Sequence, residues 1–264
     1  MASCFGASVT FTPRMNSIVR TFSLDASSKT WGTRSRFDHR DTWPYPTKSG
    51  VVGLLAAALG RDRREDVSDL AALRMGVRVD RKGVFKVDYQ TAQFVYRTEG
   101  YVAVSTPKER EWLSRYTKTP IRVDERNATV TSKRYFLSDA AFLVGLEGER
   151  ALLEALHRAL KNPRFPLYLG RKSYVPSPPP YLPDGLVEAP LAEALEGYPY
   201  LLGGKPPEDL LLALEAEEGR LVYDQPAGPF SERRFAARFV REEVLPKERV
   251  PEGPPAWEVA RVAH

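Results

Sequence analysis

The alternation of apolar and polar residues along the chain predicts several strands. Residues 76–80 and 84–89 alternate with period two on either side of Arg81-Lys82-Gly83, which predicts a β-hairpin. Residues 135–146, rich in Phe, Leu and Val, predict a further strand, and residues 16–25 predict a first one. In the C-terminal third, a second hairpin and a last strand are expected at residues 210–214, 221–223 and 235–240.

Three segments carry the features of helices. Thr47 is a suitable N-cap for a helix that runs through Leu59 and ends at Gly60 in the C′ position. A shorter helix is expected at residues 67–75. A third helix, at residues 149–160, places four leucines on one face: Leu152, Leu153, Leu156 and Leu160. The order of strands and helices indicates an α+β fold rather than a parallel, doubly wound sheet.

Residues 90–134 interrupt this pattern. They show little apolar periodicity and contain many bases. A compact domain seldom carries so long an irregular insertion without a function. We therefore expect this segment to have a role of its own.

The charges are distributed unevenly along the chain. Its 264 residues include 39 Lys and Arg against 34 Asp and Glu, a net charge of only +5. Residues 31–64 and 105–134 each carry an excess of four bases, and residues 158–172 contain five bases and no acid. Residues 186–218 instead contain eight acids and one base. Basic segments are expected if one face meets a polyanion, although solvated surface charge would give the same counts.

Composition excludes several classes of protein. The apolar run at residues 51–59 is far shorter than the roughly 20 residues of a membrane span. Cys4 is the only cysteine, which excludes an internal disulfide and a cysteine-based zinc cluster, and the three histidines are far apart. The N-terminus lacks the basic-then-apolar pattern of a secretion signal. We expect a cytoplasmic protein with no metal, no cofactor and no membrane partner.

The segment Thr47-Lys48-Ser49-Gly50 begins the first predicted helix. Unpaired backbone N–H groups and the helix dipole favour a phosphate at such a position. It is not a P-loop, because Thr42 stands where that motif has its first glycine. The alternative is an N-capped helix whose lysine is exposed.

A second glycine-containing segment, Tyr168-Leu169-Gly170-Arg171-Lys172-Ser173, lies in the acid-free basic stretch. Glycine lets a sugar–phosphate chain approach closely, the bases neutralise phosphates, and tyrosines can stack on nucleobases. A tight turn with solvated bases is the alternative. The neighbouring bases favour RNA.

The segment from Trp31 to Phe37 interleaves aromatic residues with Arg34 and Arg36. This composition is typical of single-stranded nucleic-acid interfaces, where aromatic rings stack on bases. Trp31 either stacks in this way or lies in the core.

Candidates for catalysis are few. His39 follows Asp38 in a polar segment and is a candidate general base, whereas His157 lies within a predicted helix and His264 at the end of the chain. The sequence contains no G-x-S-x-G elbow, no H-E-x-x-H and no paired metal-binding carboxylates. Binding is therefore favoured over catalysis.

Four segments together resemble the Cas-five (CasD) family, a CRISPR-associated subunit of the type I-E surveillance complex called Cascade. They are Trp31-Gly32, residues 46–60 with P-T-K-S-G-V-V-G-L-L, residues 133–142, and residues 168–173 with Y-L-G-R-K-S. They follow the family's order from about Trp31 to Tyr181. The two quoted phrases together are far more specific than either one alone.

The resemblance implies a ferredoxin-like, RRM-type domain at residues 31–182, with an inserted β-hairpin thumb at about 90–132. A C-terminal, β-rich extension at 183–264 would pack on the same domain. It further implies a non-catalytic, RNA-binding subunit that caps the 5′ handle of the guide RNA in antiviral defence. Its partners would be the backbone and large subunits of Cascade, with target DNA met only within the complex. The acidic residues 186–218 would then lie away from the RNA, toward another subunit.

The resemblance also assigns roles to individual residues. Handle phosphates and sugars would be bound by residues 47–50 and 170–172, while Trp31, Tyr168 and Tyr135 would stack on bases. The thumb and its base would use Arg110, Arg115, Lys118, Lys133 and Arg134. The complete set of residues expected at the RNA is Trp31, Arg34, Arg36, Thr47, Lys48, Ser49, Gly50, Arg110, Arg115, Lys118, Lys133, Arg134, Tyr168, Gly170, Arg171, Lys172 and Ser173.

The first thirty residues depart from the family pattern. Family members carry Gly-Pro-x-Gln shortly before Trp-Gly, whereas Ala26-Ser27-Ser28-Lys29-Thr30 stand here. The handle contact of that segment is therefore not carried over. We hypothesise that residues 1–30 reflect an altered or misread start, which sequencing of the native N-terminus would test.

Two other functions stay open at this point. Relatives in another CRISPR subtype cut the repeat transcript without a metal ion, and such an endoribonuclease needs a general base near the scissile phosphate. No histidine adjoins Lys133-Arg134-Tyr135 in the sequence. A pure protein scaffold, the second alternative, would not bind RNA even at low salt.

Overall fold

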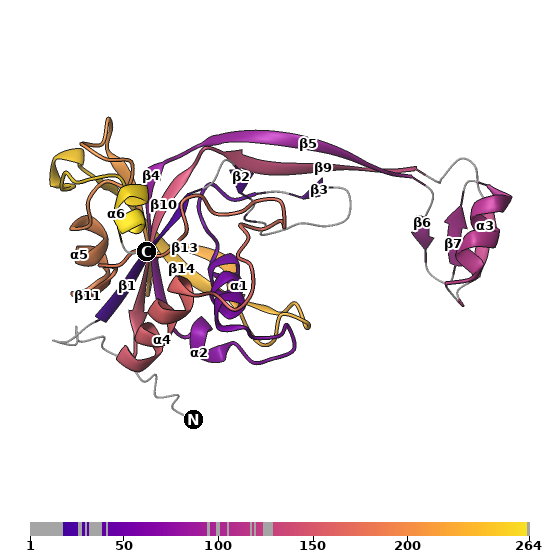
Figure 1. Cartoon of the computed structure of the whole chain (residues 1–264), viewed down its shortest axis with the longest axis horizontal. Coiled ribbons are helices and arrows are strands. Elements are labelled where there is room, and N and C mark those ends of the chain that lie inside the picture. Colours follow the sequence, from indigo (N-terminus) through magenta and orange to yellow (C-terminus); the bar gives the residue numbers. More distant parts are fainter. Residues whose placement is uncertain are drawn as a thin grey trace, which may run out of the picture.

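The computed structural model describes residues 18–25, 28–29, 31, 39–40, 42–93, 96–98, 101–104, 106–116, 118, 120–123 and 129–262. In this part of the chain the fold is mixed α+β and is built on one large antiparallel sheet. The predicted α+β class is confirmed. Figure 1 shows this body at one end and a long two-stranded ribbon that projects from it.

The large sheet contains seven strands in the order β11-β1-β10-β4-β12-β14-β13. Its central strand pairs are β1 with β10 and β10 with β4, both in the antiparallel sense. The β12 strand then pairs with β4, so that the C-terminal strands extend the same sheet. The bounds are β1 Ile18–Asp25, β4 Arg74–Arg81, β10 Ala141–Gly148, β11 Leu186–Glu188, β12 Leu210–Ala216, β13 Arg220–Pro226 and β14 Phe235–Leu245.

Helices cover both faces of this sheet and enclose two cores. On one face lie α1 (Lys48–Leu59), α2 (Ser68–Ala71) and α4 (Arg150–Lys161), and α4 buries the predicted leucine face at Leu153, Leu156 and Leu160. On the other face, α5 (Leu191–Glu196) packs against β1, β4 and β10. The chain then adds a 3₁₀ turn, Lys247–Arg249, and α6 (Ala256–Val262), whose Ala256 joins the second core.

The ribbon is a direct continuation of two strands of the large sheet. After β4, the chain continues as β5 (Val84–Gln93), and β10 is preceded by β9 (Thr129–Ser138). β5 and β9 pair without interruption from Val84 opposite Ser138 to Gln93 opposite Thr129. Two short strands, β2 (Ser28–Lys29) and β3 (His39–Arg40), pair with the other edge of β9.

The bend between sheet and ribbon depends on two residues with left-handed backbones. Gly83 has φ +70°, and a Cβ atom there would lie 2.6 Å from the Ser138 carbonyl oxygen. On the facing strand, Asp139 has φ 57°, and its carbonyl accepts a hydrogen bond from the Arg81 side chain. A glycine is therefore required at position 83, where a side chain would collide with the opposite strand.

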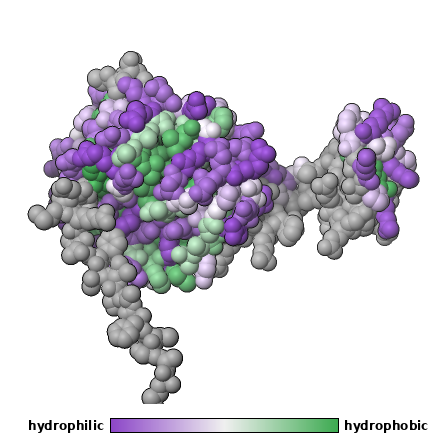
Figure 2. Space-filling model, turned by 90° about the horizontal axis from the view of Figure 1, so that it is seen from below, coloured by the Kyte–Doolittle hydropathy of each residue, from purple (hydrophilic) through white to green (hydrophobic). Residues whose placement is uncertain are grey.

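A small separate cluster of elements lies at the end of the ribbon. It contains β6 (Tyr96–Thr98), β7 (Tyr101–Val104), α3 (Pro107–Ser114) and β8 (Ile121–Val123). Thr106 and Glu109 form a capping box at the start of α3, and Pro107 takes the first helical position. The coloured surface of this tip in Figure 2 is mostly hydrophilic.

Several elements predicted from the sequence are confirmed. The first helix has Thr47 as its N-cap and Gly60, with φ 80°, as its C-cap. The helix at 149–160 and the strands at 16–25 and 235–240 are also present, each with bounds shifted by a few residues or a longer extent. The helix expected at 67–75 is only one turn long, because β4 already begins at Arg74.

Both predicted hairpins are wrong. β4 does not pair with β5 but with β10 and β12, and β5 pairs with β9. In the C-terminal third, β14 inserts between β12 and β13, so these two do not pair either. In both cases the strands form as expected but pair differently: β5 with the distant β9, and β13 with β14, the next strand in the chain.

Candidate nucleic-acid interface

The N-terminus of α1 is held inside the molecule. The Thr47 hydroxyl accepts a hydrogen bond from the Gly50 N–H at 3.3 Å, as an N-cap should. The Lys48 side chain is only 1% exposed, and its ammonium donates to both Glu215 carboxylate oxygens at 2.9 and 3.0 Å. Burial lowers the pKa of Lys48, and the Glu215 carboxylate opposes this shift.

The anion at this helix terminus comes from the protein itself. The Lys48 backbone N–H donates to the Asp224 carboxylate at 2.7 Å. Arg238 donates to the same carboxylate at 2.6 and 2.9 Å, and both residues are buried. A helix N-terminus attracts an anion, and here Asp224 of β13 already occupies that place.

The expected RNA contacts of this segment are therefore corrected. Thr47 and Lys48 are buried and satisfied by internal partners, so neither side chain is available to bind a phosphate. Trp31 is 2% exposed and packs over Gly50, where a Cβ atom would lie 2.8 Å from its ring. Trp31 is thus a core residue, and Gly50 is the small residue that makes room for it.

The second glycine-containing segment is a tight turn on the surface. Leu169 N–H donates to the Tyr174 carbonyl at 2.7 Å, and Tyr174 N–H donates to the Arg171 carbonyl at 2.9 Å. Gly170 takes the left-handed conformation at φ 91°, which a glycine adopts without strain. We call residues 168–174 the Arg171 turn. Its exposed members are Gly170, Lys172 and Ser173, while Tyr168 is half-buried.

Arg171 is fixed by two contacts on the ribbon side of this turn. Its guanidinium donates to the Asp88 carboxylate at 2.9 Å and lies 5.1 Å from the centre of the Tyr174 ring. The Tyr174 ring in turn lies 5.8 Å from that of Phe136 on β9. The Nη2 atom of Arg171 is buried and has no hydrogen-bond partner in this structure, so the accessible part of the guanidinium is small: the side chain is 18% exposed. These contacts give the planar guanidinium a fixed orientation beside the exposed Lys172.

The ribbon brings a second arginine to the same place. Asp88 on β5 lies opposite Arg134 on β9, so both arginines adjoin one carboxylate. Successive strand residues point to opposite faces, which separates Arg134 from its neighbours Lys133 and Tyr135. Lys133 is exposed on the other face, opposite Tyr89, which is 60% exposed.

The remaining predicted residues lie elsewhere or outside the described chain. Arg110, Arg115 and Lys118 are exposed on the tip, at the far end of the ribbon from the Arg171 turn (Figure 1). Ser49 is half-buried beside Thr47. Arg34 and Arg36 lie outside the described residues.

Sequence reasoning missed Asp88, which binds the Arg171 guanidinium. Phe136 lies within residues 133–142, one of the four family-like segments, and Tyr174 directly follows Y-L-G-R-K-S, but the sequence assigns neither of them a role beside Arg171. The pairing of Asp88 with Arg171 joins residues 83 positions apart and becomes visible only in the fold.

No catalytic constellation forms around these arginines in the described part of the chain. His157 lies on α4, where its Nε2 atom is 3.1 Å from the Tyr181 hydroxyl and burial lowers the pKa of its imidazole. The His39 side chain and His264 lie outside the described residues. Among the residues described, no group of three or more His, Cys, Asp or Glu is arranged for a metal ion. None of the described helices is long and apolar enough to cross a membrane.

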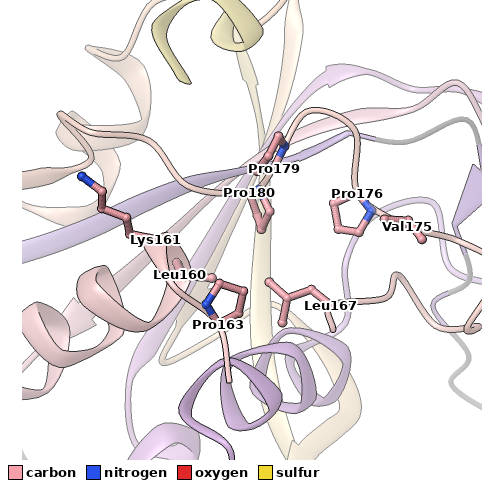
Figure 3. A pocket seen from close by; sticks show the side chains of 8 residues that line it. All are labelled: Leu160, Lys161, Pro163, Leu167, Val175, Pro176, Pro179 and Pro180. Atoms are coloured by element: carbon pink, nitrogen blue, oxygen red, sulfur yellow. The ribbon is translucent and has the colours of Figure 1, made fainter. Parts of the chain in front are cut away.

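A cavity of about 260 Å³ flanks the Arg171 turn on its other side. Leu167 and Val175, just before and after the turn, line it together with Leu160 and four prolines (Figure 3). Lys161 is the only charged residue in its lining, and its ammonium points away from the prolines (Figure 3). The apolar wall makes this cavity unsuited to phosphates.

A comparison with known proteins shows the family of this chain. The family described as "CRISPR-associated protein (Cas_Cas5)" matches residues 21–241, and the chain belongs to this family. The resemblance identified from the sequence is thereby confirmed.

Individual relatives agree with this assignment. The "CRISPR system Cascade subunit CasD" of Escherichia coli (strain K12) is 30% identical over 161 residues, which cover 57% of this chain and 63% of that protein. A solved structure described as "Crystal structure of Cas protein" is 76% identical with a TM-score of 0.70, covering 90% of this chain and all of that one. A chain of a "CRISPR RNA-guided surveillance complex" is 28% identical with a TM-score of 0.66, covering 92% of this chain and 98% of that chain.

Proposed function

We propose that this chain is a subunit of a CRISPR RNA-guided surveillance complex and that it holds the 5′ handle of the guide RNA. Its family and its similarity to a chain of such a complex support the first part. The observation that carries the second part is the Arg171 turn, in which Asp88 and Tyr174 fix the Arg171 guanidinium beside the exposed Lys172 and Gly170.

The topology of the body supports an RNA-binding role. The strands β11-β1-β10-β4 form an antiparallel unit, with α1 between β1 and β4 and α4 between β10 and β11. This is the β-α-β-β-α-β connectivity of ferredoxin-like and RRM-type domains. We infer that this domain extends from β1 to β11, residues 18–188, and so is longer than the expected 31–182; the ribbon and tip are its thumb, and β12, β14 and β13 extend its sheet.

The proposed contact surface is narrower than the sequence suggested. Arg171, Lys172 and Arg134 bind handle phosphates at the base of the ribbon, and Gly170 allows the sugar–phosphate chain to come close. Tyr168 and Tyr174 belong to the same turn, and the Tyr174 ring lies against the Arg171 guanidinium. The bases of the tip contact the RNA or a neighbouring subunit further along the ribbon.

The chain is proposed to bind guide RNA without cutting it. A cleaving relative needs a general base beside the phosphate-binding cations, and the one histidine side chain described, His157, is bonded to Tyr181 instead. Labelled repeat RNA incubated with the protein, with and without EDTA, should stay intact. Site-specific products that disappear in His39→Ala would make the endoribonuclease the better assignment.

The experiment that tests RNA binding uses the double variant Arg171→Ala/Lys172→Ala. Its affinity for a handle RNA should fall at least about tenfold, and the slope of log K against log salt should become shallower by about 1.4, since two phosphate contacts are lost. A matched control is Lys82→Ala/Lys205→Ala, two exposed lysines that pair with Glu208 and Glu252 on the body. Equal affinity and slope in both variants would remove the Arg171 turn from the interface.

A further inference from the structure

The outer strands β13 and β14 expose a group of apolar side chains on one face. Tyr223 is 60% exposed, and Leu221, Phe235 and Phe239 are each between 41 and 46% exposed. Ala237 of the same face is exposed as well. We call these five residues the β13–β14 apolar face.

The register of the two strands places these residues side by side. Leu221 lies opposite Phe239, and Tyr223 lies opposite Ala237. Their neighbours Val222 and Val240 point to the other face, where they join the core under α1. Because side chains alternate along a strand, all five residues of the apolar face point away from α1.

The helices leave this face open. α1 and α2 contact β13 on its buried side, while on the opposite side α5 packs against β1, β4 and β10. Leu212 and Leu214 of β12, next to β14, are still buried in the second core. The apolar layer therefore continues from the second core out to the sheet edge, where its last side chains remain exposed. Large apolar side chains are stabilised by burial, and contiguous exposed patches of them mark interaction sites.

The charges around the face favour a protein over a nucleic acid. Arg241, on the same face, pairs with Glu243, and Arg220 at the start of β13 pairs with Glu242. Glu217 and Glu218, exposed in the turn between β12 and β13, have no ion-pair partner in the described structure, and Arg233 lies beyond Phe235 at the opposite end. A polyanion would meet two unpaired carboxylates here and few free cations.

We propose that the β13–β14 apolar face is a docking surface for another protein subunit of the surveillance complex. That subunit presents an apolar patch, and Lys or Arg side chains at its border meet Glu217 and Glu218. The proposal rests on the membership of the complex proposed above. The proposed contact lies at the β13 edge of the large sheet. The strands β1 and β11 lie at the opposite edge, beyond β4 and β12.

The test is assembly of the complex from co-expressed subunits and guide RNA, measured by native mass spectrometry. In Leu221→Lys/Tyr223→Lys, incorporation of this chain should fall at least tenfold. Val244→Lys is the matched control, because Val244 is 70% exposed and apolar but lies on the opposite face of β14. Both variants should melt and bind handle RNA as the wild type does.

A second variant avoids any effect on the sheet. Glu217→Lys/Glu218→Lys changes only an exposed turn, and it should reduce incorporation severalfold, most strongly at low salt.

The outcomes separate this proposal from the proposed function. If the wild-type chain does not enter a complex at all, the proposed function fails. If it enters and both patch variants enter equally well, the docking surface alone is overturned. If the isolated wild-type chain forms dimers that Leu221→Lys/Tyr223→Lys dissolves while leaving incorporation unchanged, the occupant is a second copy and this proposal is wrong.

Discussion

Two short segments of this chain look alike in sequence and differ in the structure. Thr47-Lys48-Ser49-Gly50 and Gly170-Arg171-Lys172-Ser173 both combine glycine, base and hydroxyl. The first is buried at the start of α1, and its lysine and helix terminus bind Glu215 and Asp224 of the same chain. The second is a surface turn in which Gly170, Lys172 and Ser173 are exposed and Arg171 lies beside them.

The difference lies in where the anion comes from. A buried cation requires a partner, because an unpaired charge in the interior is strongly destabilising. At α1 the C-terminal strands supply two carboxylates, so the segment is a structural link between helix and sheet. At the Arg171 turn, Asp88 satisfies only part of the guanidinium, and Lys172 beside it is exposed. Only the second segment remains available for an external anion.

The largest expected effect is on stability at the buried segment. Lys48→Ala removes the ammonium that binds both oxygens of the largely buried Glu215 carboxylate, and should lower the free energy of unfolding by about 3–5 kcal/mol. Chemical denaturation measures this loss. Lys172→Ala, the equivalent change in the surface turn, should stay within about 0.5 kcal/mol of the wild type. Similar losses in both variants would mean that the two segments do not differ as described.

A second buried lysine extends the comparison to pH. Lys29 is fully buried, its ammonium donates to the Ala140 carbonyl, and its carboxylate partner Asp25 is 3.6 Å away. Burial lowers the pKa of Lys29 to about 8. The folded state therefore binds the Lys29 proton less tightly than the unfolded state does. Below pH 8 the protein bears the full energetic cost of burying the charged Lys29 ammonium. This cost disappears as the pH rises toward the pKa that Lys29 has in the unfolded state.

The wild-type protein should accordingly gain stability, relative to Lys29→Met, between pH 8 and about 10.5. The gain is at most about 3 kcal/mol, from the difference between the two pKa values. Denaturation curves of both proteins across this range measure it. If the free energies of unfolding of the two proteins changed with pH in parallel, the Lys29 ammonium would not be desolvated, contrary to what the structure indicates.

A smaller effect is expected from the glycine of the buried segment. In Gly50→Ala the new methyl group meets the Trp31 ring at 2.8 Å, so the protein should lose about 1–2 kcal/mol despite the better helix propensity of alanine. Gly53→Ala is the control, because its methyl group would meet Phe230 at an ordinary 3.7 Å. It should be neutral or stabilising by thermal melting. A stable Gly50→Ala would contradict the core position of Trp31.

The smallest effect concerns the position of Arg171. Asp88→Asn removes a negative charge near the RNA, yet handle affinity should fall about threefold, roughly 0.6 kcal/mol, because Arg171 loses its fixed orientation. Fluorescence anisotropy with labelled handle RNA measures this change. An increase in affinity would show that Asp88 only repels phosphate and does not position the arginine.

Local features of the fold could be predicted from the sequence, and long-range ones could not. The Thr47 cap, the Gly60 stop and the leucine face of α4 depend on neighbouring residues, and all three are present. The partner of β5 lies far along the chain and that of β12 follows only after β13, so both predicted hairpins were wrong. The site shows the same dependence on distant residues. The sequence around Lys48 does not reveal that the Asp224 carboxylate binds the N-terminus of α1, because the two residues are 176 positions apart.

The most direct test of the central claim is to locate the RNA on the protein. A guide RNA with 4-thiouridine throughout its 5′ handle can be crosslinked to this chain and the modified peptides identified by mass spectrometry. We expect crosslinks within residues 168–174 and at the base of the ribbon, around residues 132–136. Crosslinks confined to residues 47–50, with none at the Arg171 turn, would contradict it.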